Sequence, residues 1–92
     1  MAKYIRINPN HMRICAVRMR EQAKVLDEAV ARMDRLQSQL QSEWEGAASE
    51  AFAAHYFASK HYFVRMEETI QELSMKLERY VRLIEELDAS LG

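Results

Sequence analysis

His11 and Cys15 are the residues of this chain whose types and spacing come nearest to a chemical site. A separation of four places both side chains on one face of a helix. There they could form a nucleophile with its base, or half of a zinc site. Neither site is complete, because zinc takes about four ligands and a catalytic cysteine needs an oriented base and an oxyanion hole. We interpret the pair as a packed cysteine beside a histidine in the capping turn of a helix.

The remaining candidates for chemistry also have structural explanations. His55 and His61 are six residues apart, which places them on opposed faces of a helix. The six methionines fall mostly in or near hydrophobic stripes, as core residues do. The sequence holds no glycine-rich phosphate loop, no catalytic serine motif and no Glu-x-x-His pair of the di-iron type. We therefore expect a protein that is not an enzyme, with no catalytic residues, no cofactor and no metal.

The composition indicates a helical protein without a bulk charge preference. The chain has 92 residues, 49% of them apolar, with only two glycines and one proline, which is typical of one helical domain. Thirteen basic and fourteen acidic residues give a net charge of -1, whereas nucleic-acid binders and anionic-membrane anchors normally carry surplus positive charge. No apolar run resembles a cleavable signal peptide or a membrane span. The lone Cys15 cannot form an internal disulfide.

Two helices account for most of the sequence. Asn8 and Pro9 suit an N-cap and a first helical residue, and Ile7 and Met12 would form a hydrophobic staple there. Apolar residues then recur every seven positions, so we expect helices over about 9–42 and 48–89, joined by a turn at about 43–47. The expected fold is all-α, with residues 1–92 as one antiparallel helical-hairpin domain. The rows are Met12, Met19, Leu26, Met33 and Leu40, flanked by Ala16, Ala23 and Val30, and then Tyr56, Phe63, Ile70, Leu77 and Ile84, flanked by Phe52, Met66, Leu73, Tyr80 and Leu87.

Charge placement supports the antiparallel pairing. The first 24 residues carry six basic residues and one acidic residue, whereas residues 67–88 are rich in acidic residues. Within each helix this polarity opposes the helix macrodipole, but the two ends would attract each other if they lay side by side. Exposed ion pairs contribute only about 0–1 kcal/mol each, so they indicate the register of the helices more than their stability.

A single hairpin would leave part of this apolar surface uncovered. The two apolar rows of the second helix are together wider than one neighbouring helix can cover, and each large side chain left in water forgoes roughly 1.5–3 kcal/mol. We therefore expect a homodimer in which two hairpins form a four-helix bundle. The expected dimer-interface residues are Phe52, Tyr56, Phe57, Phe63 and Met66 of the second helix and Leu26, Met33 and Leu40 of the first.

Trp44 and Gly46 mark the turn, because the only tryptophan and the only internal glycine lie two residues apart between the helices. A left-handed glycine just after the first helix would let the following amides bond to its last carbonyl groups. We therefore expect Gly46 to end that helix and Trp44 to be displayed at the tip. Two interpretations remain open: Trp44 plugs the end of the bundle, or it forms part of a recognition surface.

The Trp-x-Gly turn, together with an Ile-x-Ile-x-Pro start and with Ala47, Ala48 and Phe52 after the turn, resembles the WXG family. Members of that family are early-secreted-antigen-like substrates of type VII secretion. The resemblance spans nearly the whole chain. It implies a hairpin that dimerises antiparallel into a four-helix bundle and leaves the cytoplasm folded. Export would need no cleaved signal peptide and would use a membrane machine powered by an FtsK/SpoIIIE-like ATPase.

The resemblance also implies a bipartite export signal. In the family, the Trp-x-Gly turn of one subunit lies near a C-terminal Tyr-x-x-x-Asp/Glu motif of its partner. Here the turn supplies Trp44 and Gly46, and Asp88 aligns with the acid while Ile84 takes the place of the tyrosine. The C-terminal part of the signal is therefore matched only in part.

Other functions remain open beside that of a secreted substrate or adaptor. The chain could be a small partner that dimerises with, or escorts, a larger toxin carrying a similar helical domain. The aromatic-rich start of the second helix could also insert in membranes as part of a virulence effector, although the near-neutral charge and the competing dimer interface disfavour this. A further class is a generic structural coiled coil, in which Trp44 would serve only as core.

Overall fold

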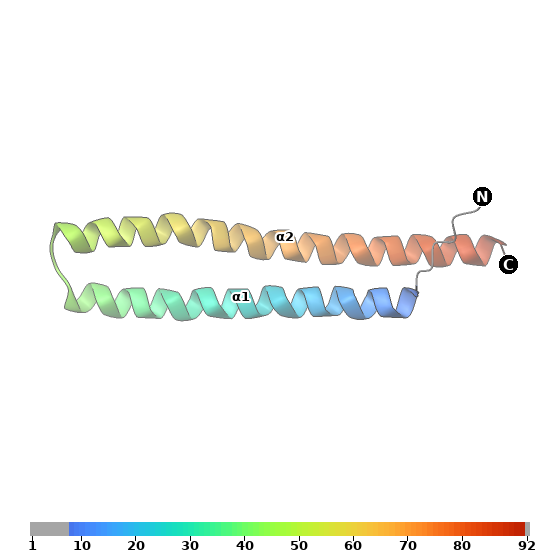
Figure 1. Cartoon of the computed structure of the whole chain (residues 1–92), viewed down its shortest axis with the longest axis horizontal. Helices are drawn as coiled ribbons and strands as arrows, with labels where there is room; N and C mark the ends of the chain where they lie inside the picture. Colours follow the sequence, from blue (N-terminus) through green and yellow to red (C-terminus); the bar gives the residue numbers. More distant parts are fainter. Residues whose placement is uncertain (1–7, 92) are drawn as a thin grey trace.

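The computed structural model describes residues 8–91, which form two long helices packed side by side. Helix α1 spans Pro9–Glu43 and helix α2 spans Ala47–Leu91. The chain reverses direction between them, so the helices are antiparallel, and the hairpin measures 69 × 22 × 17 Å (Figure 1). The expected all-α antiparallel hairpin is confirmed, and each helix end lies within two residues of the position expected from the heptad pattern.

Helix α1 begins at the cap predicted from the sequence. Asn8 is the N-cap in an extended conformation, and its Oδ1 accepts hydrogen bonds from the backbone amides of Asn10 and His11 at 3.0 and 3.3 Å. Pro9 occupies the first helical position, where its missing amide leaves no bond unmade. The proposed staple partner Ile7 lies outside the described residues.

Small side chains form the seam between the helices. Ala16 and Ala23 of α1 and Ser74 of α2 are completely buried. The Ser74 Oγ donates a hydrogen bond to the carbonyl oxygen of Ala16 at 2.9 Å, which satisfies a hydroxyl that would otherwise be costly to bury. Because the seam residues are small, the backbones can approach closely. The larger heptad row of α1 therefore lies at the flank of the seam, and Met33 in that row stays 51% exposed.

Ion pairs across the helices confirm the register expected from the charges. Arg13 of α1 pairs with Glu85 of α2, and Arg20 pairs with Glu78. Arg20 also donates a hydrogen bond to the hydroxyl of Ser74 at 3.3 Å. The basic start of α1 therefore lies beside the acidic last third of α2. These side chains are partly exposed, so each pair specifies alignment more than it stabilises the fold.

The turn corrects one expectation from the sequence. Helix α1 ends at Glu43, and Trp44 follows in an extended conformation with φ -133° and ψ 115°. Gly46 has a positive φ of 116°, as expected, but its carbonyl oxygen accepts the amide of Glu50 at 3.2 Å, a bond that belongs to the start of α2. The extended Trp44 carries the chain away from the axis of α1, so Gly46 cannot close that helix. Gly46 instead turns the chain into α2.

Candidate interaction site at the groove and the turn

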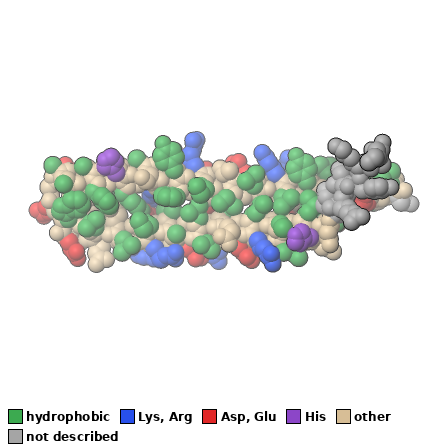
Figure 2. Space-filling model, viewed as in Figure 1, with side chains coloured by type: hydrophobic (Ala, Val, Ile, Leu, Met, Phe, Trp, Pro, Cys, Tyr) green, Lys and Arg blue, Asp and Glu red, His purple; other side chains and the backbone are tan. Residues whose placement is uncertain are grey.

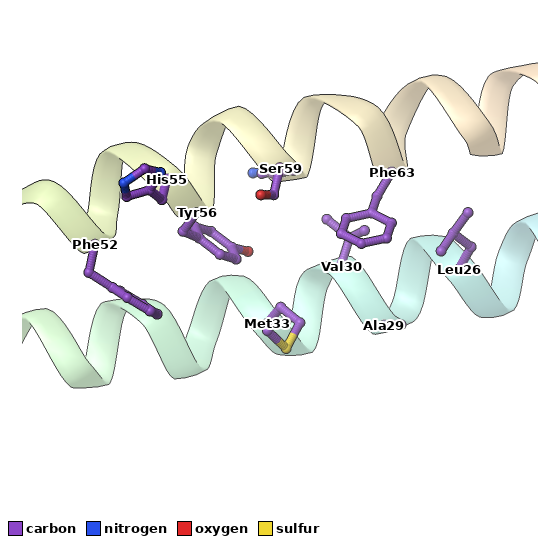
Figure 3. Close-up of a pocket in the computed structure, with 10 residues that line it drawn as sticks. Leu26, Ala29, Val30, Met33, Phe52, His55, Tyr56, Ser59 and Phe63 are labelled. Atoms are coloured by element: carbon purple, nitrogen blue, oxygen red, sulfur yellow. The ribbon is translucent and has the colours of Figure 1, made fainter.

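An apolar groove lies between the two helices on one side of the hairpin, near the turn (Figure 3). Its volume is about 330 Å³, and side chains from both helices line it. It is lined by Leu26, Ala29, Val30 and Met33 of α1 and Phe52, His55, Tyr56, Ser59, Lys60 and Phe63 of α2. The accessible surface of the groove is almost entirely apolar. Such a surface suits another apolar side chain or helix better than a polar small molecule.

The groove continues into a longer apolar face on α2. Phe52 is followed at heptad spacing by Met66, Leu73, Tyr80 and Leu87, and each of these five side chains is between 44% and 61% exposed. The seven-residue spacing keeps them on one side of the helix. Figure 2 shows hydrophobic side chains gathered along both helices on the face in view. We call the groove and this row together the apolar face. Large exposed apolar surfaces of this kind mark interaction sites.

Most of the residues expected at a dimer interface come together here. Leu26, Met33, Phe52, Tyr56 and Phe63 line the groove. Leu40 and Met66 lie beyond it and keep the spacing of its walls, Leu40 seven residues after Met33 and Met66 fourteen after Phe52.

Phe57 is the exception among the expected interface residues. It does not line the groove. Its position five residues after Phe52 places it about 140° further around the helix. It is 58% exposed, and its ring meets that of Tyr56 edge-on at a centroid distance of 5.4 Å. The sequence cluster of aromatic residues therefore divides between two sides of α2.

Asp34 makes a polar contact beside the groove that the sequence did not single out. The Tyr56 hydroxyl donates to its Oδ1 at 2.5 Å, and the Lys60 ammonium donates to its Oδ2 at 2.8 Å. Both bonds lower the pKa of the Asp34 carboxyl, and the bond from Lys60 has the larger effect. Burial and the bond to Asp34 raise the pKa of Tyr56 to about 12. The only sequence signal was the four-residue spacing of Tyr56 and Lys60, which places them on one face of a helix.

A row of charged residues on α1 includes one mismatched position. Residues 13, 20, 27 and 34 are spaced by seven, and three of them meet opposite charges on α2. The fourth, Asp27, faces another carboxyl, that of Glu67. The pKa of Glu67 is raised, first of all by burial. The charge of Asp27, a hydrogen bond with Asp27 and the charge of Glu68 raise it further. Gln71 also donates to the Glu67 Oε1 at 3.4 Å.

Trp44 lies at the turn end of the groove. Its side chain is partly buried, and its ring packs against Phe52 with centroids 5.9 Å apart and ring planes inclined by 50°. Gln41 fixes the turn beneath it, because its Nε2 donates to both the carbonyl oxygen and the hydroxyl of Ser49 at 3.3 Å. Gly46 is exposed, and a Cβ added there would meet nothing within 4 Å. The indole therefore contacts the wall of the groove and stays partly exposed.

The two halves of the expected export signal lie at opposite ends of the hairpin. Ile84 is partly buried and Asp88 is exposed, both in the last turns of α2. Trp44 lies just before the first turn of the same helix, so roughly 60 Å of helix separates it from Ile84 at 1.5 Å per residue. A single hairpin cannot bring the two halves together.

His11 and Cys15 lie in contact near the start of α1. The Cys15 Sγ lies 3.8 Å from the His11 Nε2. Across residues 8–91, no three histidine, cysteine, aspartate or glutamate side chains are grouped so that they could hold a metal ion. In the same part of the chain, neither helix is long and apolar enough to cross a membrane.

Fold and surface together define a helical-hairpin protein with one large exposed apolar face. Residues 4–89 match the family described as proteins of 100 residues with WXG, WXG100. The chain is 33% identical to protein YukE of Bacillus subtilis over 92 residues, which cover 100% of this chain and 95% of YukE. The chain therefore belongs to the WXG100 family, whose members are small, non-enzymatic secreted substrates of type VII secretion.

Solved structures support the same assignment. EsxA of Geobacillus thermodenitrificans superposes with a TM-score of 0.84 at 30% identity, over 100% of this chain and 99% of that one. The secreted protein EsxB of Bacillus anthracis superposes with a TM-score of 0.82 over 96% of this chain and 99% of that one, and at 22% identity this likeness concerns the fold alone.

Proposed function

We propose that this protein is exported by a type VII machine as a folded antiparallel homodimer, without any catalytic step of its own. The observation that carries the proposal is the apolar face left exposed along the hairpin. Covering one of its large side chains contributes roughly 1.5–3 kcal/mol when burial is complete. Several such side chains on each subunit supply enough free energy to hold two hairpins together.

A second copy of the chain suits this face because both helices contribute apolar side chains to it. A two-fold axis across the hairpin pairs the face with itself and gives a closed, four-helix assembly. If the subunits run antiparallel, the turn of one lies near the last turns of α2 of the other. Trp44 and Gly46 would then stand near the partner's Ile84 and Asp88, which one chain alone keeps apart.

In this assembly the Trp44 turn is the proposed docking point for an FtsK/SpoIIIE-like ATPase. The indole is an amphipathic ring that is only partly covered by Phe52, and partly exposed tryptophans are favoured contact residues at interfaces. Before export the protein would be cytoplasmic, and no cleaved signal peptide would be needed.

Export is tested by following the intact protein in the medium of the producing cell. We expect the full-length chain to accumulate outside the cell, and we expect deletion of residues 84–92 to stop this. Trp44→Ala should also stop export while leaving a folded dimer. Accumulation of both variants outside the cell at the level of the unaltered protein would contradict the proposed role of the turn and the C-terminal segment.

A second candidate function is that of an escort for a larger toxin with a similar helical domain. The apolar walls of the groove favour it, because they offer few polar groups that would select an identical chain over a related one. Co-expression with such a toxin from the same genome tests this. A stable mixed complex would favour the escort role, whereas separate homodimers would favour self-association.

A further inference from the structure

Phe52 lies between two features with different proposed roles, the Trp44 indole and the apolar groove. On one side its ring packs against Trp44, with centroids 5.9 Å apart. On the other side it forms part of the wall of the groove, and 44% of it is exposed. In Figure 3 it points from α2 toward α1 at one end of the groove. Phe52 both lines the groove and packs against the indole.

We infer that Phe52 is a positioning residue, through which occupancy of the groove fixes the orientation of the Trp44 indole. The inference rests on the proposed function, because it takes a second copy of the chain as the occupant. An exposed aromatic ring changes rotamer within picoseconds to nanoseconds. A partner packed in the groove removes that freedom, because close-packed interfaces hold side chains in single rotamers.

The backbone around the indole makes this coupling effective. Gln41 ties the end of α1 to Ser49 in the first turn of α2, so the turn itself has little room to move. The remaining freedom of Trp44 lies in its side chain, and Phe52 packs against that side chain directly. A dimer therefore presents the indole in one orientation, whereas a free hairpin presents several. A docking protein that needs a preorganised indole binds the assembled pair more tightly than the single chain.

Trp44 fluorescence tests the inference directly, because this is the only tryptophan of the chain. The full-length protein is diluted stepwise, with quenching by acrylamide followed at each concentration and the molar mass measured in parallel by light scattering. We expect quenching to increase as dimers dissociate. Phe52→Leu keeps an apolar wall but removes the ring, so it should still dimerise while its quenching is high at every concentration and no longer follows dissociation.

Phe63→Leu is the matched control. It makes the same change in the same groove, three helical turns away from the indole contact, so it should keep the link between quenching and dissociation. If Phe52→Leu loses helix content by circular dichroism, Phe52→Met replaces it as the test.

The outcomes separate the inference from the proposed function. If Phe52→Leu retains the quenching change of the unaltered protein, the coupling is overturned. If the unaltered protein dimerises but its quenching does not respond to dilution, the coupling is again overturned and the dimer stands. A protein that stays monomeric at every concentration overturns both.

Discussion

Replacing Phe63 by glutamate should dissociate the dimer, because it places a charge in the wall of the groove. Phe63 is 47% exposed in the single hairpin, so about half of its burial would come from the partner. Complete burial of such a side chain contributes roughly 1.5–3 kcal/mol. Each of the two copies in the dimer loses about half of this, so the dimer as a whole loses roughly 1.5–3 kcal/mol. Since 1.4 kcal/mol is a factor of ten in affinity, this loss alone weakens the dimer about 10- to 100-fold.

The introduced carboxylate adds a second cost. An unpaired charge removed from water costs several kcal/mol, and the accessible lining of the groove is almost entirely apolar. We therefore expect Phe63→Glu to be monomeric at micromolar concentration by light scattering.

Phe57→Glu provides the matched control for this variant. It makes the same substitution six residues earlier on α2, at a side chain that is 58% exposed and lies away from the groove. Glutamate is a good helix former at both positions, and circular dichroism checks the helix content. The Phe57→Glu protein should remain a dimer. A dimeric Phe63→Glu, or dissociation of the Phe57→Glu protein instead, would refute the assignment of the groove as the interface.

Three further predictions concern stability. The raised pKa of Glu67 means that the folded state binds its proton more tightly than the unfolded state, so the effect on stability is most favourable below the ordinary pKa of 4.5 and is lost as pH rises through the raised pKa. Glu67→Gln should thus stabilise the protein at pH 7 by about 0.2–0.5 kcal/mol in urea titrations. It should have no such effect near pH 3, and an equal gain at both pH values would contradict this. Tyr56→Phe should lower the free energy of unfolding by about 0.5–1.5 kcal/mol in the same titrations. Because the pKa of Tyr56 is raised to about 12, the whole loss should be seen below about pH 10 and should disappear as pH rises toward 12. No loss at pH 7 would exclude a stabilising bond to Asp34. Gly46→Ala should lower Tm by roughly 4–8 °C, because a side chain at a φ of 116° costs about 1 kcal/mol through strain without any clash; an unchanged Tm would show that the turn relaxes.

The sequence predicted the hairpin well because its signals are local and repeat many times. The cap at Asn8 and Pro9 places the start of α1 without reference to any other part of the chain. The charge distribution then gave the alignment, which the pairs of Arg13 and Arg20 with α2 confirm. Errors at single residues do not accumulate in a pattern that recurs every seven positions.

The role of Gly46 was missed because it depends on backbone angles that a sequence does not state. Gly46 was expected to close α1, but the extended backbone of Trp44 moves it to the start of α2. A glycine after one helix and before another suits both positions. Phe57 was expected at the dimer interface because it lies among aromatic neighbours, and its rotation of about 140° from Phe52 places it away from the groove. Composition located the aromatic cluster, and only helical geometry divides it.

The contact between Trp44 and Phe52 could not be predicted from the sequence for a similar reason. The seven residues between them include the turn, whose backbone angles decide where the indole points. The ring is partly buried and also lies at the tip, which fits either interpretation of Trp44.

The molar mass of the unaltered full-length protein at micromolar concentration tests the central claim most directly. The association of two hairpins through the apolar face predicts twice the chain mass of 10.8 kDa by light scattering, with dissociation on dilution. A mass of 10.8 kDa at every concentration, with the helices intact, would contradict it.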